Sequence, residues 1–278
     1  MMQDNVRRLM WRLGRNLYSR ARGEPGNGDI ATGGEAYVQR CVIAGSAADN
    51  SLRVIDIGAN LGEWTLSFLK GVVDAGRAGG DIQIHLFEPV PGTRDLLQAN
   101  LAAQTADRTA KVHGSAVSDV SGHAFMQIVG DTSGRNSLIA NELTASGVIE
   151  VETVTLADVF SIFGIERSQL VKVDAEGHDP AIIRGARALL AAGRIDVLQF
   201  EYNHTWVFSR SFLKDIFDIA EGLPYSIARI RPHSVEVFGA WHPELDRFFH
   251  CNYLLIREPA LAWFDVVPGR FDVSNTYA

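Results

Sequence analysis

Cysteine is scarce in this sequence, which contains only Cys41 and Cys251 and no C-x-x-C pair. Two cysteines so far apart form neither a disulfide framework nor a structural zinc site. No apolar run reaches the roughly 18 residues that a membrane span requires. The net charge is −7, and lysine and arginine cluster only at the N-terminus, which argues against a nucleic-acid partner. Because a continuous apolar signal segment is also missing, we expect a cytoplasmic location.

The N-terminal segment is rich in arginine and has apolar residues at helical spacing. These apolar residues are Val6, Leu9, Met10, Leu13 and Leu17. The spacing predicts an amphipathic helix in an N-terminal helical extension over residues 1–50, ahead of a main domain over residues 51–278. Such a helix either touches a membrane surface or an anionic partner, or lies over the main domain with its arginines in water. We expect the second arrangement.

From residue 51 onwards, short β-branched runs alternate with amphipathic stretches. This pattern is typical of an α/β fold with a mostly parallel sheet and helices on both faces. The segments "GHAFMQIVG" and "GVIEVETVTL" alternate with a period of two and predict an antiparallel pair attached to that sheet. Their polar link, residues 131–146, is long enough to be a candidate substrate loop.

The stretch "VIDIGANLGEWT" joins a predicted buried strand to a helix and carries Asp56, Gly58 and Asn60. Ligands in open α/β sheets bind at such carboxyl ends of strands. The third glycine of a dinucleotide fingerprint is missing. A carboxylate beside the loop suits a sulfonium better than a pyrophosphate, which favours S-adenosylmethionine over a nicotinamide cofactor. At the end of the next strand, Glu88 in "LFEP" can accept both ribose hydroxyls.

Two further strand ends, "DAEGHD" and "EYNH", carry groups suited to proton transfer. The catalytic candidates are Asp174, His178, Glu201 and His204, with Asp174 the strongest choice and the histidines as general-base candidates. An alternative is that Asp174, Glu201 and Asn203 form an oxygen-ligand site for Mg²⁺, which would orient the acceptor and lower its pKa.

Five segments in order resemble the FkbM-type S-adenosylmethionine-dependent methyltransferases: "VIDIGANLGEWT", "LFEPVPGTRDLLQANL", "GSAVSDVSG", "VETVTLADVF" and "VKVDAEGHDPAIIRGA". The resemblance implies a class I methyltransferase fold, Rossmann-like, with a seven-stranded sheet. It also implies O-methylation of a hydroxyl on a sugar or secondary metabolite. The cofactor contacts that it implies are Asp56, Gly58, Asn60, Glu88, Ser115 and Ala116.

Other functions stay open at this point. The same scaffold supports N-methylation, a nicotinamide or nucleotide-sugar oxidoreductase, or a non-catalytic module that keeps the cofactor fold to bind a partner. The sequence names neither the acceptor nor the position that is methylated, and it leaves open whether the chain forms a homo-oligomer.

Overall fold

The computed structural model describes residues 2–22, 29–49, 51–104, 109–129, 136–139 and 147–271. Its α-helices are α1 (Met2–Ala21), α2 (Glu35–Gly45), α3 (Glu63–Asp74), α4 (Pro91–Ala103), α5 (Leu156–Ile162), α6 (Asp179–Gly185), α7 (Arg187–Ala191) and α8 (Leu213–Ala220). Short 3₁₀ helices are η1 (His204–Val207), η2 (Pro243–Leu245) and η3 (Glu258–Trp263). None of the helices in these ranges is both long and apolar enough to cross a bilayer.

The strands form one large and one small sheet. They are β1 (Ser51–Ile57), β2 (Asp81–Phe87), β3 (Ala110–His113), β4 (Ala116–Ser118), β5 (Gly122–Ile128), β6 (Gly147–Thr155), β7 (Ser168–Val173), β8 (Ile195–Tyr202), β9 (Tyr225–Ile230), β10 (Val235–Phe238), β11 (Cys251–Arg257) and β12 (Val266–Gly269). The large sheet has the order β12-β10-β9-β11-β8-β7-β1-β2-β3.

Strands β8, β7, β1, β2 and β3 run parallel, whereas β11 runs antiparallel between β8 and β9. The expected α/β class with a mostly parallel sheet is confirmed. The expected strand count of seven is too low for the described residues, because β10 and β12 extend the edge beyond β9. The chain runs from β1 towards β3 on one side and returns to β7 on the other, so its direction reverses between β1 and β7.

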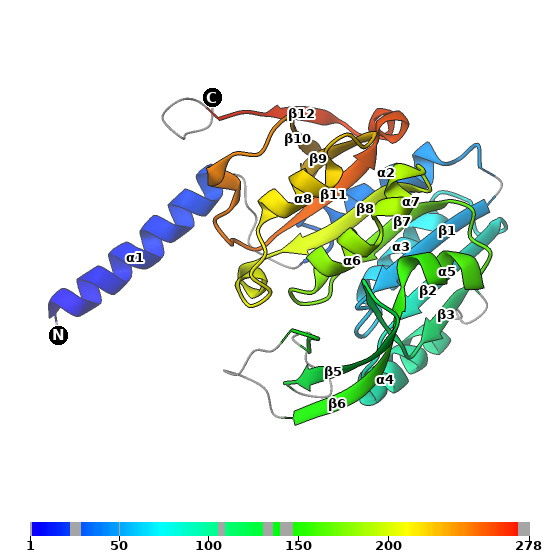
Figure 1. Ribbon diagram of the computed structural model, residues 1–278. Helices are drawn as coiled ribbons and strands as arrows, with labels where there is room; N and C mark the ends of the chain where they lie inside the picture. The colour runs from blue at the N-terminus through cyan, green and yellow to red at the C-terminus, as the bar shows by residue number, and fades with distance from the viewer. Residues whose placement is uncertain are drawn as a thin grey trace.

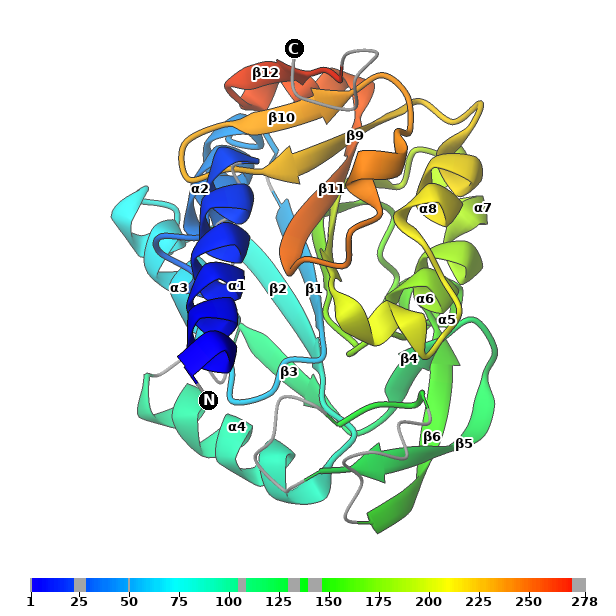
Figure 2. The ribbon, with the colours of Figure 1, turned by 90° about the vertical axis from the view of Figure 1, so that its left-hand side faces the viewer.

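Helices cover both faces of the large sheet (Figure 2). Successive residues of a strand point to opposite faces, so Val54 packs in the core beneath α2, α3 and α4, whereas Ile55 packs in the core beneath α5, α6, α7 and α8. Both side chains are fully buried. The continuous apolar run in the sequence of β1 therefore reflects a strand that is covered on both sides.

The expected antiparallel pair is present as β5 and β6, but it does not belong to the large sheet. Strand β4 pairs with β6 in parallel, and the three strands form a separate sheet beside the main body (Figure 1). The stretch "AKVHGSAVS" is therefore divided between two sheets. Of the candidate substrate loop, only residues 136–139 lie within the described part of the chain.

The N-terminal region divides differently from the expectation. Helix α2 contributes Val38, Val42 and Ile43 to the core shared with β1, so it belongs to the main domain although it precedes residue 51. Helix α1 projects from the body instead of lying over it (Figure 1). Its residues from Asp4 to Tyr18 are all exposed, so the expectation that its apolar side covers the main domain is wrong.

Candidate active site

The loop between β1 and α3 depends on residues with positive φ angles. Gly58, Asn60 and Gly62 have φ values of 74°, 46° and 85°. A Cβ atom at Gly58 would lie 1.8 Å from the carbonyl oxygen of Asp174. Glycine at this position therefore lets the ends of β1 and β7 approach each other closely.

Glu88 follows β2 and holds the same loop from the other side. Its Oε2 accepts a hydrogen bond from the Asn60 N–H at 3.1 Å, and its Oε1 accepts one from the Val90 N–H at 3.0 Å. The side chain is buried, and burial raises the pKa of the carboxyl group above its ordinary value. Each oxygen retains a lone pair that is free to accept a further hydrogen bond.

A first cavity, called cavity A, opens beside Glu88; with the open space at its mouth it spans about 560 Å³. Its walls come from the glycine loop, the residues after β2 and the small sheet, and include Val90, Ala116 and Met126. Asn136 and Leu138, from the described part of the candidate substrate loop, also line it. Of the two residues expected near an adenine ring, Ala116 lines cavity A and Ser115 does not.

Asp56 lies behind the loop. Its carboxylate accepts a hydrogen bond from the Thr65 hydroxyl at 2.6 Å and lies 3.7 Å from the Lys172 ammonium. The side chain is fully buried, which raises the pKa of its carboxyl group, and it lines neither of the two cavities described here. Asp56 therefore ties the end of β1 to α3 and β7, and it does not line a cavity as its position at the strand end suggests.

A second cavity, called cavity B, lies on the other side of the glycine loop; with the open space at its mouth it spans about 750 Å³. Ionisable residues of its wall are Glu35, Glu63, Lys172, Asp174, Glu201 and His250. Cavities A and B share Gly58, Asn60 and Asp174. They therefore meet where the strand order reverses, at the carboxyl ends of β1 and β7.

Asp174 and Lys172 form an ion pair at this junction. The Lys172 Nζ lies 3.0 Å from the Asp174 carboxylate, and Lys172 stands opposite Asp56 in the pairing of β7 with β1. Burial lowers the pKa of Lys172, but the carboxylates of Asp174, Asp56 and Glu35 outweigh it, and the pKa is raised overall. The lysine therefore stays charged and offsets part of the surrounding negative charge.

Glu201 and His250 form a second pair, at the end of β8 and just before β11. The His250 Nε2 lies 2.5 Å from Glu201 Oε1, and this hydrogen bond raises the pKa of the imidazole. Burial, and then the nearby Asp174, raise the pKa of Glu201. The pair therefore binds a proton more tightly than either group would in water. This property suits it to take a proton from a bound hydroxyl group.

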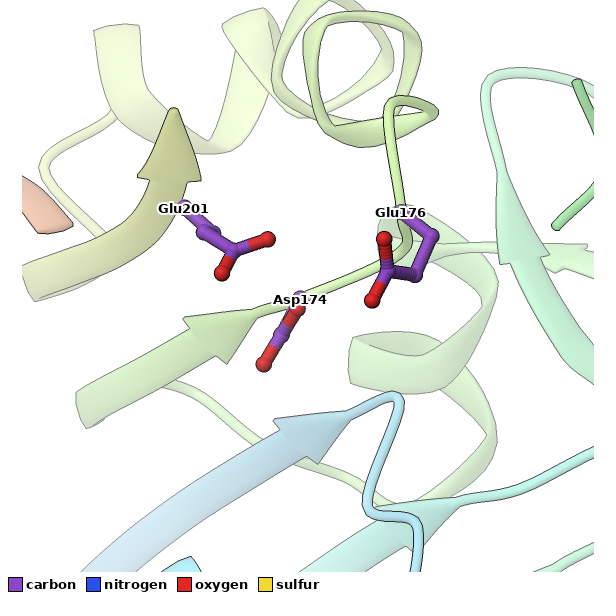
Figure 3. A group of neighbouring side chains, drawn as sticks. All are labelled: Asp174, Glu176 and Glu201. Carbon is purple, nitrogen blue, oxygen red and sulfur yellow. The ribbon is translucent and has the colours of Figure 1, made fainter. Parts of the chain in front are cut away.

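Asn203, which the sequence analysis places among Mg²⁺ ligands, is engaged elsewhere. Its amide donates to Glu201 Oε2 at 2.5 Å, while its Oδ1 accepts the Thr205 N–H at 2.6 Å and caps η1. Asp174, Glu176 and Glu201 instead bring carboxylate oxygens within 4.8 Å of one another (Figure 3). Lys172 already lies against Asp174 as a positive partner, and His250 is hydrogen-bonded to Glu201.

The structure brings together only part of the predicted catalytic set. Asp174 and Glu201 both line cavity B, as the strand-end argument predicts. His204 is exposed on η1 and lines neither cavity. His178 lines cavity A, where its Nε2 lies 2.9 Å from the Ser118 hydroxyl and burial lowers its pKa.

Four ionisable residues of cavity B are absent from the predicted set: Glu35, Glu63, Lys172 and His250. Lys172 interrupts the apolar strand "LVKVD", and such a charge in a buried strand is a signal that could have revealed it. His250 precedes its strand and Glu35 comes from α2, so neither follows a parallel strand. Burial raises the pKa of Glu35 to about 7, and its Oε1 accepts a hydrogen bond from the buried Gln199 at 2.5 Å.

Comparison with known proteins identifies the family of this chain. The family model described as the methyltransferase FkbM domain matches residues 56–253. The chain belongs to the FkbM methyltransferase family. The expected FkbM methyltransferase domain is thereby confirmed, and it disfavours an oxidoreductase on the same scaffold.

Solved structures of methyltransferases are similar to this FkbM-family chain at low identity. The methyltransferase FkbM from Methylobacillus flagellatus KT is 20% identical with a TM-score of 0.46, and the match covers 74% of this chain and 44% of that one. The O-methyltransferase from Bacillus cereus in complex with S-adenosylhomocysteine is 10% identical with a TM-score of 0.42, covering 79% and 80% of the two chains. No curated protein matches the sequence.

Proposed function

We propose that this FkbM-family enzyme transfers a methyl group from S-adenosylmethionine to a hydroxyl oxygen of a small acceptor, a sugar or a secondary metabolite. The observation that carries the proposal is the junction of two cavities at Gly58, Asn60 and Asp174. Cavity A has the carboxylate and apolar walls that suit an adenosine. Cavity B has the paired ionisable groups that suit removal of a proton from a hydroxyl.

The residues of cavity A fit the adenosine half of the cofactor. Glu88 can accept the ribose hydroxyls, while Val90, Ala116 and Met126 supply apolar surface for the adenine ring. Among the described residues, the buried Oδ1 of Asn60 has no hydrogen-bond partner, so a donor from a ligand would satisfy it. S-adenosylmethionine supplies a methyl group on a positively charged sulfur, which leaves as a neutral thioether once an oxygen attacks.

The residues of cavity B prepare the acceptor. A hydroxyl is a weak nucleophile at neutral pH, so its proton must pass to a base as the new oxygen–carbon bond forms. The Glu201–His250 pair is the base in this proposal, and it takes up the hydroxyl proton while the carbon–sulfur bond breaks. Asp174, which lines both cavities, accepts a hydrogen bond from the acceptor and orients it towards the methyl group.

The contacts of these side chains make a Mg²⁺ site of Asp174, Glu201 and Asn203 less favourable than the sequence suggests. Asn203 is committed to Glu201 and η1, and Lys172 supplies positive charge beside Asp174. We therefore expect a chelator to leave turnover unchanged. A loss of turnover with chelator that added Mg²⁺ restores would instead assign the carboxylates of Asp174, Glu176 and Glu201 to a metal.

A labelled-methyl assay tests the function. The enzyme is incubated with methyl-labelled S-adenosylmethionine and a panel of methyl glycosides, phenols and amino sugars, and the product is identified by mass spectrometry and NMR. We expect a methyl ether. Transfer to the nitrogen of an amino sugar, with no transfer to oxygen, would overturn the choice of a hydroxyl acceptor.

Substitutions then test the site. Asp174→Asn and Glu201→Gln should each lower turnover at least about tenfold, because each removes a charged hydrogen-bonding group from the acceptor side. Both variants should bind S-adenosylhomocysteine nearly as tightly as the parent enzyme. Glu152→Gln, at an exposed position of β6, is the matched control. Normal turnover in both site variants would place the chemistry elsewhere.

A further inference from the structure

Helix α1 presents a continuous apolar stripe to solvent. The stripe consists of residues that recur every three or four positions and that are between 51% and 67% exposed: Val6, Leu9, Met10, Leu13 and Leu17. Trp11 is 72% exposed but lies about 140° around the helix from Val6, outside the stripe. A helix of 20 residues is about 30 Å long, so the stripe is an extended surface and not an isolated apolar residue.

The helix is attached to the body by its other side and near its C-terminal end. The Tyr18 hydroxyl donates to Glu244 at 2.8 Å, the Arg22 guanidinium donates to the same carboxylate at 2.9 Å, and Arg15 lies over the Phe249 ring. At about 100° per residue, Tyr18 and Arg15 lie roughly 120° and 180° around the helix from Val6, at the centre of the stripe. These contacts hold the helix with its stripe facing away from the protein.

The charge of α1 is opposite to that of the whole chain. Five arginines and one aspartate give the helix a net charge of +4, whereas the chain carries −7. The arginines are Arg7, Arg8, Arg12, Arg15 and Arg20. Arg7 and Arg12 flank the apolar stripe on its two sides, and an apolar stripe bordered by arginines is the pattern of helices that lie in the interface of an anionic bilayer.

We propose that α1 docks this methyltransferase on the surface of a membrane that contains anionic lipids. The stripe enters the boundary between headgroups and acyl chains, and the flanking Arg7 and Arg12 meet the lipid phosphates. Pairing with α1 of a second copy would cover the stripe too, but it would bring two helices of charge +4 together. Anionic headgroups instead neutralise that charge, so the bilayer is the better match.

Vesicle sedimentation tests the proposal with the full chain. The probes are vesicles of phosphatidylcholine alone and of phosphatidylcholine mixed with phosphatidylglycerol. We expect binding to the mixed vesicles only, and weaker binding as salt screens the charges. The double substitution Leu9→Glu with Leu13→Glu should lower the partition coefficient more than about tenfold, because it places charges in the stripe. Arg7→Gln and Arg12→Gln should each lower it about fivefold.

The controls separate docking from misfolding. Ile162 on α5 is 66% exposed, so Ile162→Glu removes a similar apolar side chain elsewhere and should leave vesicle binding unchanged. Since the stripe touches neither cavity, all variants should bind S-adenosylhomocysteine normally. Equal sedimentation with both vesicle types, or no sedimentation with either, would overturn the proposal. So would a dimer in analytical ultracentrifugation that the Leu9→Glu and Leu13→Glu pair converts to monomer.

Discussion

Replacing Glu88 by glutamine tests the placement of the cofactor without knowledge of the acceptor. The carboxylate accepts one backbone N–H on each oxygen, from Asn60 and Val90, and still has lone pairs for two ribose hydroxyls. In Glu88→Gln, one oxygen becomes an NH₂ group that meets a backbone donor. Hydrogen bonds to charged groups contribute about 1.5–3 kcal/mol each. Loss of the ribose hydrogen bond on that oxygen therefore corresponds to about 1.5–3 kcal/mol, or a roughly 10- to 100-fold weaker affinity for S-adenosylhomocysteine.

The affinity should also depend on pH in a defined direction. Burial raises the pKa of Glu88 above its ordinary value of 4.5. Because the ionised carboxylate is the better acceptor, affinity is present above this raised pKa and is lost as the pH falls through it. The glutamine variant has no such group, so its dissociation constant should vary less over the same range.

Isothermal titration calorimetry with S-adenosylhomocysteine gives both quantities. Glu152→Gln makes the same chemical change at an exposed position and should leave the dissociation constant unchanged. Thermal unfolding of Glu88→Gln is needed beside it, because Glu88 also holds the glycine loop. A folded variant with the affinity of the parent enzyme would refute the placement of adenosine in cavity A.

Three further predictions concern protons and packing. The hydrogen bond to Glu201 raises the pKa of His250, so turnover should rise with pH through a value above 6.5. In stopped assays, His250→Gln should abolish this rise and lower turnover about 10²- to 10⁴-fold. If Glu35→Gln abolishes the rise instead, Glu35 is the base. Burial lowers the pKa of His85 from 6.5 to about 4, so the free energy of unfolding should fall by about 3 kcal/mol as the pH drops from about 7 to 4. Denaturant titrations measure this fall, and the same fall in His85→Phe would contradict the prediction. Gly58→Ala should lower both the melting temperature and the affinity for S-adenosylhomocysteine, because the alanine Cβ would clash with the Asp174 carbonyl oxygen. If calorimetry shows the affinity of the parent enzyme, the loop shifts at little cost.

The residues that the sequence predicts to lie together, and that the structure does bring together, follow parallel strands. Glu88 and Asp174 each follow a buried strand, and parallel neighbours place their carboxyl ends at one edge of the sheet. The position of Asp56 in its strand was equally clear. The direction of its side chain was not, because that depends on Thr65 of the helix that packs over it.

The remaining residues depend on pairings between distant segments. His250 stands before its strand, and it reaches cavity B because β11 runs antiparallel to β8 and pairs Cys251 with Tyr202. Alternation of apolar residues does not specify that direction. Glu35 enters from a helix whose packing against the sheet becomes apparent only once the core is assembled. The separate sheet of β4, β5 and β6 likewise depends on pairing between distant segments, which the sequence pattern does not specify.

The buried ammonium group of Lys172 links the two halves of the site energetically. It lies 3.0 Å from Asp174, which lines both cavities, and 3.7 Å from Asp56, which accepts a hydrogen bond from Thr65 of α3 just after the glycine loop. An acceptor that bonds to Asp174 changes the field at Lys172 and hence the balance of charge beneath the loop. Coupling of binding energies is reciprocal, so any effect of the proposed acceptor on cofactor affinity through this lysine is matched by an equal effect of the cofactor on acceptor affinity.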